Sequence, residues 1–173
     1  TRFRRSSGES YRGRAMNAWT AGADGLHLFN YFNPNAAMWK ELGDPNALQV
    51  MDKLYFVNVR DDDPHRFLAK GREYRTVPVV GPSHPRLVTA GESVTLGIEI
   101  GDDISAAQRR GYKAGVTLHL EVPSVKNADQ LHVKFNGIEL AGGLLNAGWI
   151  DYSVPLTAAK QGTNKVEIVV DPS

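Results

Sequence analysis

The residue types best suited to chemistry in this sequence are Asn30, Tyr31 and Asn33, which lie close together in the chain. Asn30 and Tyr31 lie near the end of an apolar run that spans residues 25–32, and Asn33 comes directly after it. Amides and a phenol can hydrogen-bond to sugar hydroxyls, and an aromatic ring suits the apolar face of a pyranose. We therefore predict that these three residues bind a ligand, with carbohydrate as the class. The alternative is that Tyr31 is a core residue and Asn33 only starts the turn that follows.

Carboxylates are the next candidates, because hydrolysis of a glycosidic bond needs two carboxyl groups about 5–5.5 or 6.5–9.5 Å apart. Asp24 precedes the apolar run, while Glu41 and Asp44 suit a helix and its cap. The remaining candidates alternate with apolar residues and are expected to face solvent, namely Glu99, Glu121, Glu139 and Glu167. We expect no catalytic pair in this chain, so its catalytic residues are unknown.

No metal site and no cofactor is predicted. His27, His119 and His132 lie on separate predicted strands, and no spacing places two of them on one ion. The adjacent acidic residues 61–63 are predicted to be a hydrated linker turn, because nothing there fixes a coordination geometry. The sequence has no cysteine, which excludes disulfides, zinc thiolate sites and cysteine nucleophiles.

The composition is that of an ordinary globular protein, with 42% hydrophobic and 23% charged residues. The formal net charge of +1 gives no reason to expect a nucleic-acid partner. No apolar run approaches the ~18 residues of a membrane-spanning helix, so no membrane partner is expected. The compartment stays open, with export to the periplasm or the cell exterior as part of a longer precursor as one alternative.

The elements that would position the candidate binding residues are a helix and a strand. Apolar residues at three- and four-residue spacing predict a helix over residues 10–23, with Ser10 as its cap. Residues 25–32 (GLHLFNYF) predict a short buried strand, as found in a parallel sheet with both faces covered. One strand cannot make a sheet, so this segment indicates a fragment of an α/β repeat.

Two further helices are predicted after that strand. The first covers residues 36–42, and the second starts where Asp44 can cap and Pro45 can occupy the first helical position. The apolar stripe of the second helix would consist of Leu48, Met51, Leu54 and Tyr55. We assign residues 1–72 to this partial α/β segment and its linker.

The pattern changes near residue 73 to strict alternation of apolar and polar residues. It predicts strands over residues 94–100, 116–122, 131–135, 150–156 and 166–170. An earlier edge strand is predicted over 74–80, the dipeptide Asn136-Gly137 predicts a hairpin, and the loop over 101–115 is expected to hold a short helix over 105–110. Residues 73–173 are therefore predicted to form an antiparallel β-sandwich, because two sheets with one apolar face each must cover each other.

The end of the chain carries a pattern that resembles a known module. One strand turns at Asn136-Gly137, another ends at Val154-Pro155, and a Gly-Thr-Asn turn over 162–164 introduces the last strand. Residues 131–170 thereby resemble the last strands of the galactose-binding-like jelly rolls appended to glycoside hydrolases. The resemblance implies a jelly-roll β-sandwich and says little about any ligand.

A second resemblance covers residues 11–48 (YRGRAMNAWTAGADGLHLFNYFNPNAAMWKELGDPNAL). This stretch looks like the final repeat of a glycosidase-type (β/α)8 barrel, with its seventh helix followed by its eighth strand. Such a barrel needs about 250 residues, and its active site gathers at the carboxyl ends of the strands. The family's catalytic carboxylates normally lie on earlier strands, which this chain lacks.

Together these features predict the carboxyl-terminal, non-catalytic portion of a glycoside-hydrolase-like protein. Its β-sandwich would serve as a structural or carbohydrate-contacting accessory domain. One alternative is an intact hydrolase once the missing repeats are joined to it, and another is a structural interaction module without sugar affinity. The strand over residues 25–32 is also expected to mediate self-association, because an apolar strand with open edges can pair with another chain.

Overall fold

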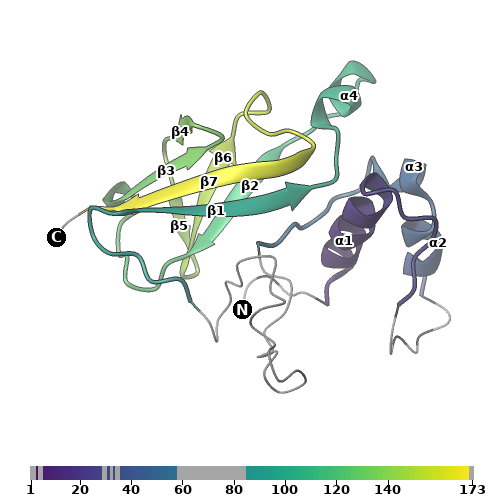
Figure 1. Cartoon of the computed structure of the whole chain (residues 1–173), viewed down its shortest axis with the longest axis horizontal. Coiled ribbons are helices and arrows are strands. Elements are labelled where there is room, and N and C mark those ends of the chain that lie inside the picture. Colours follow the sequence, from purple (N-terminus) through teal and green to yellow (C-terminus); the bar gives the residue numbers. More distant parts are fainter. Residues whose placement is uncertain are drawn as a thin grey trace.

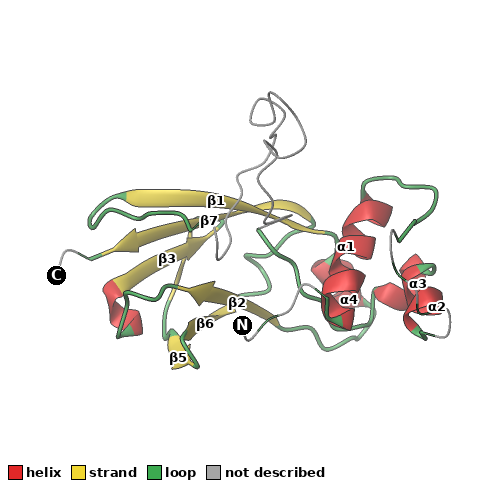
Figure 2. Ribbon diagram, turned by 90° about the horizontal axis from the view of Figure 1, so that it is seen from below, coloured by secondary structure: helices red, strands yellow, loops and turns green. Residues whose placement is uncertain are grey.

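The described part of the chain is mainly β, with two antiparallel sheets and a few short helices. The computed structural model describes residues 3, 6–28, 31, 33, 36–57 and 85–171. Figure 1 shows helices α1 (Gly8–Thr20), α2 (Met38–Leu42) and α3 (Pro45–Leu48) gathered beyond one end of the sheets. The sheets form two layers in Figure 2, an arrangement compatible with the predicted β-sandwich.

The larger sheet has four strands in the order β1–β7–β3–β4, all antiparallel to their neighbours. The strands are β1 (Ser93–Ile100), β3 (Leu131–Phe135), β4 (Ile138–Leu140) and β7 (Gly162–Val170). The turn between β3 and β4 has φ values of +50° at Asn136 and +83° at Gly137. Two successive left-handed residues form the type I′ turn typical of two-residue hairpins, so the predicted hairpin is confirmed.

The smaller sheet has three strands in the order β2–β6–β5. They are β2 (Val116–Glu121), β5 (Leu144–Asn146) and β6 (Trp149–Val154). The sequence did not predict β5, because its three residues are all exposed and show no alternation. The predicted short helix between β1 and β2 is confirmed as α4 (Ile104–Arg109).

The core lies between the two sheets. Fully or nearly fully buried side chains come from both layers, with Val133 of β3 and Ile150 of β6 at 0% exposure. The same cluster includes Ile98, Leu118, Phe135, Tyr152, Val154, Val166 and Ile168. The inward residues of each strand therefore cover the apolar face of the opposite sheet, as the alternating pattern predicted.

A buried polar residue organises the start of β7. Asn164 is 0% exposed, and its side-chain oxygen accepts from the Asn136 amide at 2.8 Å and from the Lys160 backbone N–H at 3.0 Å. Its side-chain nitrogen donates to the carbonyl oxygens of Lys160 at 2.7 Å and Gly162 at 2.9 Å. One side chain thus joins the hairpin turn of β3 and β4 to the loop that leads into β7.

A second, smaller core lies among the helices. Ala15, Met16, Leu42 and Leu48 form its buried part, and Leu26 and Leu28 pack against it. The predicted strand over residues 25–32 is not observed in its described part, because residues 25–28 and 31 lie in no strand. Leu26 and Leu28 are instead half-buried against the helical core, without strand pairing.

The helix boundaries differ from the predicted ones. α1 begins at Gly8 rather than Ser10, and its cap is Ser7, whose hydroxyl accepts from the Ser10 backbone N–H at 3.2 Å. Ser10 itself is buried inside the first turn, at 1% exposure. Apolar spacing shows which face of a helix is buried, but it fixes the first residue of the helix only to within one or two positions. The prediction of Ser10 as the cap was wrong for this reason.

The predicted cap at Asp44 is confirmed, because its carboxylate accepts from the backbone N–H groups of Asn46 and Ala47 at 2.9 and 3.2 Å. The predicted apolar stripe is wrong beyond Leu48, since α3 ends there. The chain then leaves the helices, and Tyr55 packs against the core between the sheets rather than on a helix face.

The helices meet the sandwich at Gly101, just after β1. Asn17 donates to the Glu99 carbonyl at 3.2 Å, and the Thr20 hydroxyl donates to the Gly101 carbonyl at 2.9 Å. A β-carbon on Gly101 would lie 2.7 Å from the Met16 backbone carbon, which is closer than atoms can pack. A glycine is therefore needed where α1 touches the end of β1.

Some predicted features lie outside the described residues. These are the candidate binding residue Asn30, the acidic turn over 61–63, the domain boundary near residue 73 and the edge strand over 74–80.

Candidate functional site

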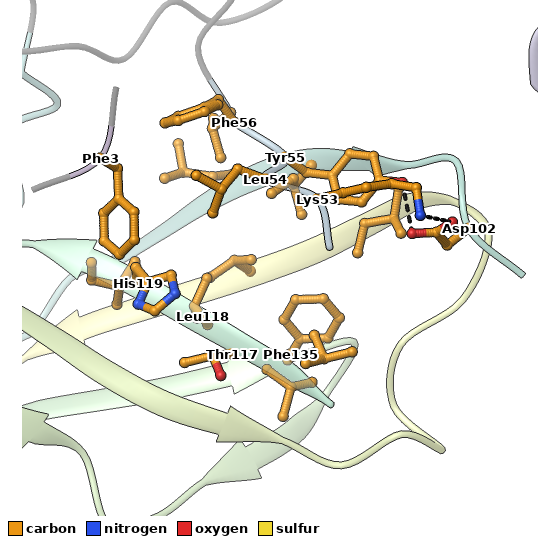
Figure 3. Close-up of a pocket in the computed structure, with 18 of the residues that line it drawn as sticks. Phe3, Lys53, Leu54, Tyr55, Phe56, Asp102, Thr117, Leu118, His119 and Phe135 are labelled. Atoms are coloured by element: carbon orange, nitrogen blue, oxygen red, sulfur yellow. Dashed lines mark hydrogen bonds and ion pairs between the residues drawn. The ribbon is translucent and has the colours of Figure 1, made fainter. Parts of the chain in front are cut away.

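A cavity of about 1650 Å³ opens between β1 and β2, which are outer strands of their sheets. Both inner faces contribute apolar side chains to it, including Val94, Leu96, Leu118, Leu120 and Val122. Figure 3 shows residues 53–56 above these strands. Pockets for small molecules usually measure about 300–1,000 Å³, so this hollow is better described as an open apolar groove.

One end of the groove carries a charged cluster (Figure 3). The Lys53 ammonium lies 3.0 Å from Asp102 Oδ1, and the Lys53 side chain is only 2% exposed. Lys53 also donates to the Met51 carbonyl at 2.8 Å. The Tyr55 hydroxyl donates to Asp102 Oδ2 at 2.9 Å. Asp102, on the loop after β1, thereby holds the segment around residues 53–55 against the sandwich.

The electrostatics of this cluster favour a structural role. Burial, and then the negative charge of Asp102, raise the pKa of the Tyr55 phenol far above its ordinary value. The phenol therefore keeps its proton at neutral pH and directs it at the carboxylate. Lys53 is paired with the same carboxylate, which lowers the cost of burying its charge. The cluster therefore holds the segment in place, since both Lys53 and Tyr55 pair with Asp102.

The other end of the groove extends past β2 to the outer side of the smaller sheet. Phe3, Thr117, His119, Glu121 and Trp149 line it there. Leu118 of β2 and Ile150 and Tyr152 of β6 point into the core, so their alternate neighbours point outward. We call these outward residues the outer face: Thr117, His119, Glu121, Leu144, Asn146, Trp149, Asp151 and Ser153.

Strand register arranges the outer face in rows. One row pairs Leu144 with Asp151 and Asp151 with His119. The next row pairs Asn146 with Trp149 and Trp149 with Glu121. The half-buried Trp149 ring thus lies between an amide and a carboxylate, beside a histidine–aspartate pair.

His119 and Asp151 form a close pair. The distance between His119 Nδ1 and Asp151 Oδ1 is 2.7 Å, and their side chains are 22% and 15% exposed. Because an ionised carboxylate only accepts, the imidazole donates through Nδ1. This bond fixes the orientation of the ring and directs its Nε2 away from Asp151.

The predicted binding residues Tyr31 and Asn33 lie elsewhere, beside α1 and α2. The Tyr31 ring centroid is 5.7 Å from that of Tyr11 and 5.2 Å from that of Trp39, both in edge-on contact. The Trp39 indole donates to the Asn33 backbone carbonyl at 2.7 Å, and 36% of Trp39 is exposed. The structure therefore brings Tyr31 and Asn33 together around Trp39, away from the groove.

Sequence reasoning missed the residues that line the groove. His119 read as an isolated strand histidine, because its partner Asp151 is 32 positions away and only the β2–β6 register brings them together. Trp149 and Asp151 occupy the alternate positions of their strand that face solvent. This alternation was the sequence signal that could have pointed to them. Lys53 gave no signal, since its pairing depends on a loop 49 residues later.

No group of three histidine, aspartate or glutamate side chains in the described ranges could hold a metal ion. Among the helices that the structure describes, none is long and apolar enough to cross a membrane.

No protein-family model matches the sequence, and no curated protein matches it.

Proposed function

We propose that this chain is a non-catalytic accessory portion of a carbohydrate-active protein, and that the outer face of its smaller sheet contacts a glycan. The observation that carries the proposal is the register that sets Trp149 between Asn146 and Glu121 and beside the His119–Asp151 pair. An aromatic ring can take the apolar face of a pyranose, while amide, carboxylate and imidazole groups hydrogen-bond its hydroxyls.

The shape of the surface supports the same proposal. His119, Glu121 and Trp149 line a hollow rather than a convex surface. The outer face also carries hydroxyl groups in the row beyond His119 and Asp151, where Thr117 pairs with Ser153 and both are exposed. A sugar ring on Trp149 would therefore have polar groups within one strand spacing on either side.

The wider assignment is part of the proposal. The two sheets would be a galactose-binding-like jelly roll, and helices α1 to α3 would derive from the last repeat of a (β/α)8 barrel. The catalytic carboxylates would then belong to a part of the parent protein outside these 173 residues. The Asn136-Gly137 hairpin and the Gly-Thr-Asn turn over 162–164 support this assignment, because they match the pattern by which the sequence resembles such modules.

Glycan titration of the full chain tests the proposal. Hexasaccharides of β-1,4-glucan, β-1,4-xylan, β-1,4-mannan and β-1,4-galactan, together with free galactose, would be titrated by calorimetry and by amide NMR. We expect binding of at least one sugar, with shifts centred on Trp149 and its row. Trp149→Ala should weaken that binding by at least about tenfold, because the ring supplies the stacking surface.

A second tryptophan provides the matched control. Trp39→Ala removes a partly exposed ring next to Tyr31 and Asn33 and should leave the affinity within about twofold. If Trp39→Ala abolishes binding and Trp149→Ala does not, the glycan contacts the Tyr31 cluster predicted from the sequence. If no sugar binds, the accessory role is structural, and the proposed carbohydrate contact is wrong.

A further inference from the structure

The ring of Phe3 lies directly on the proposed sugar site. Its centroid is 4.2 Å from that of the His119 imidazole, with 37° between the planes. It is 5.0 Å from the Trp149 ring, at 84°. Figure 3 shows Phe3 above His119. A flat six-membered ring is thus already seated between the two aromatic residues of the outer face.

We infer that Phe3 occupies the subsite that a pyranose ring would take, so that the amino-terminal segment and a glycan compete for the outer face. This inference rests on the proposed function, because it concerns regulation of the same site. A sugar ring and a phenyl ring have similar size, and both pack on aromatic surface. They cannot both lie within 5.0 Å of the Trp149 ring on the same side.

The position of Phe3 in the chain makes displacement feasible. Phe3 comes five residues before α1, whose first residue is Gly8. The remaining members of the site are held by strand pairing, since His119 belongs to β2 and Trp149 to β6. The site is therefore built on rigid elements, and its occupant belongs to the amino-terminal segment.

The competition has a calculable effect on affinity. When the binding-competent state is a fraction of the population, the apparent dissociation constant rises in inverse proportion to that fraction. An aromatic pair of ordinary strength shifts such an equilibrium by about two- to tenfold. Removing the Phe3 ring should therefore tighten glycan binding by about two- to tenfold.

The test compares Phe3 variants of the full chain against the hexasaccharide panel. Phe3→Ala and Phe3→Leu should both bind two- to tenfold more tightly than the wild type, while Phe3→Trp should bind equally or more weakly. Nuclear Overhauser contacts between the Phe3 ring and the Trp149 indole should be present in the free protein and lost on saturation with the bound hexasaccharide. Trp39→Ala, which removes a partly exposed aromatic ring outside the lining of the groove, serves as the matched control and should leave affinity unchanged.

The outcomes separate the two proposals. If the wild type and both smaller Phe3 variants bind a hexasaccharide equally well, competition is overturned and the accessory function stands. Weaker binding by Phe3→Ala and Phe3→Leu also overturns competition, because Phe3 would then be part of the sugar site. If no variant binds any of the sugars, both proposals fail.

Discussion

Asn164 illustrates how a single polar residue can be essential to a core made of strands. It is fully buried, and its side-chain oxygen and nitrogen each make two hydrogen bonds across the turn before β7. Buried polar groups of this kind stabilise a fold only while they keep their partners. The sequence showed the Gly-Thr-Asn turn, but only the structure shows that the asparagine joins two loops.

Asn164→Ala should therefore lower the free energy of unfolding by about 3 kcal/mol, because it removes the side-chain hydrogen bonds to Asn136, to the Lys160 backbone and to the Gly162 carbonyl from a fully buried position. Urea denaturation followed by circular dichroism measures the loss. Asn146→Ala, at an exposed position on β5, is the control and should change stability by no more than about 0.5 kcal/mol. Equal losses in the two variants would contradict the role given to Asn164.

The Tyr55 phenol predicts a fall in stability at alkaline pH. Its pKa in the folded protein is raised by burial and by Asp102 above the ordinary value of about 10. The folded state therefore keeps a proton that the unfolded chain releases above pH ~10. The stabilisation is fully present below that pH and is lost progressively as the pH rises further.

Tyr55→Phe should flatten this dependence. Between about pH 9 and 11.5 the free energy of unfolding should fall less steeply in the variant than in the wild type, as measured by urea denaturation at each pH. Tyr152, whose pKa is also raised by burial, leaves a residual slope in both proteins. Parallel curves for the two proteins would show that Tyr55 ionises freely in the folded state.

Among the elements, strands were easier to predict than helices. Each predicted strand from residue 94 onward is confirmed, because the alternation of residues such as Val133 and Lys134 encodes both the strand and its buried face. β5 was missed since its residues are all exposed. The strand over 25–32 was predicted from apolar content alone, and Leu26 and Leu28 of that run pack against the helical core instead.

The candidate site was harder to predict than the elements, because it is built by register. The alternation in the sequence shows on which face of its strand each of His119 and Asp151 lies. It does not show which residue of β2 lies opposite which residue of β6. Tyr31 and Asn33 are neighbours in sequence and were found for that reason. Residues that meet only after two sheets and an amino-terminal segment assemble leave no local signal.

The contact of α1 with the end of β1 predicts a strong effect at Gly101. Gly101→Ala places a β-carbon 2.7–2.8 Å from backbone atoms of Met16 and Asn17. Because backbone cannot move aside as a side chain can, α1 should shift and the variant should lose about 1–3 kcal/mol of stability. Hydrogen exchange of α1 amides should accelerate. Gly115→Ala, where a β-carbon meets nothing within 4 Å, should leave exchange in α1 unchanged.

For the whole molecule, self-association through residues 25–32 stays a prediction. Leu28 packs against the helical core, so a charge there should harm the monomer as well as any dimer. Sedimentation over a wide concentration range tests association, and we expect a dimer that Leu28→Lys weakens. A wild-type monomer at every concentration, with Leu28→Lys less stable to urea, would instead assign Leu28 to the helical core alone.

The position of β7 has a consequence for how this chain reaches its native state. β7 lies in the middle of the larger sheet, where it pairs with β1, about 70 residues earlier, and with β3. Contacts between residues so far apart in sequence slow folding, because the chain loses the entropy of closing a long loop before these contacts can stabilise it. During synthesis the backbone edges of β1 and β3 that pair with β7 stay open until residue 170 has left the ribosome. The nascent chain is then open to aggregation through those strands, and a chain truncated before Gly162 would remain so.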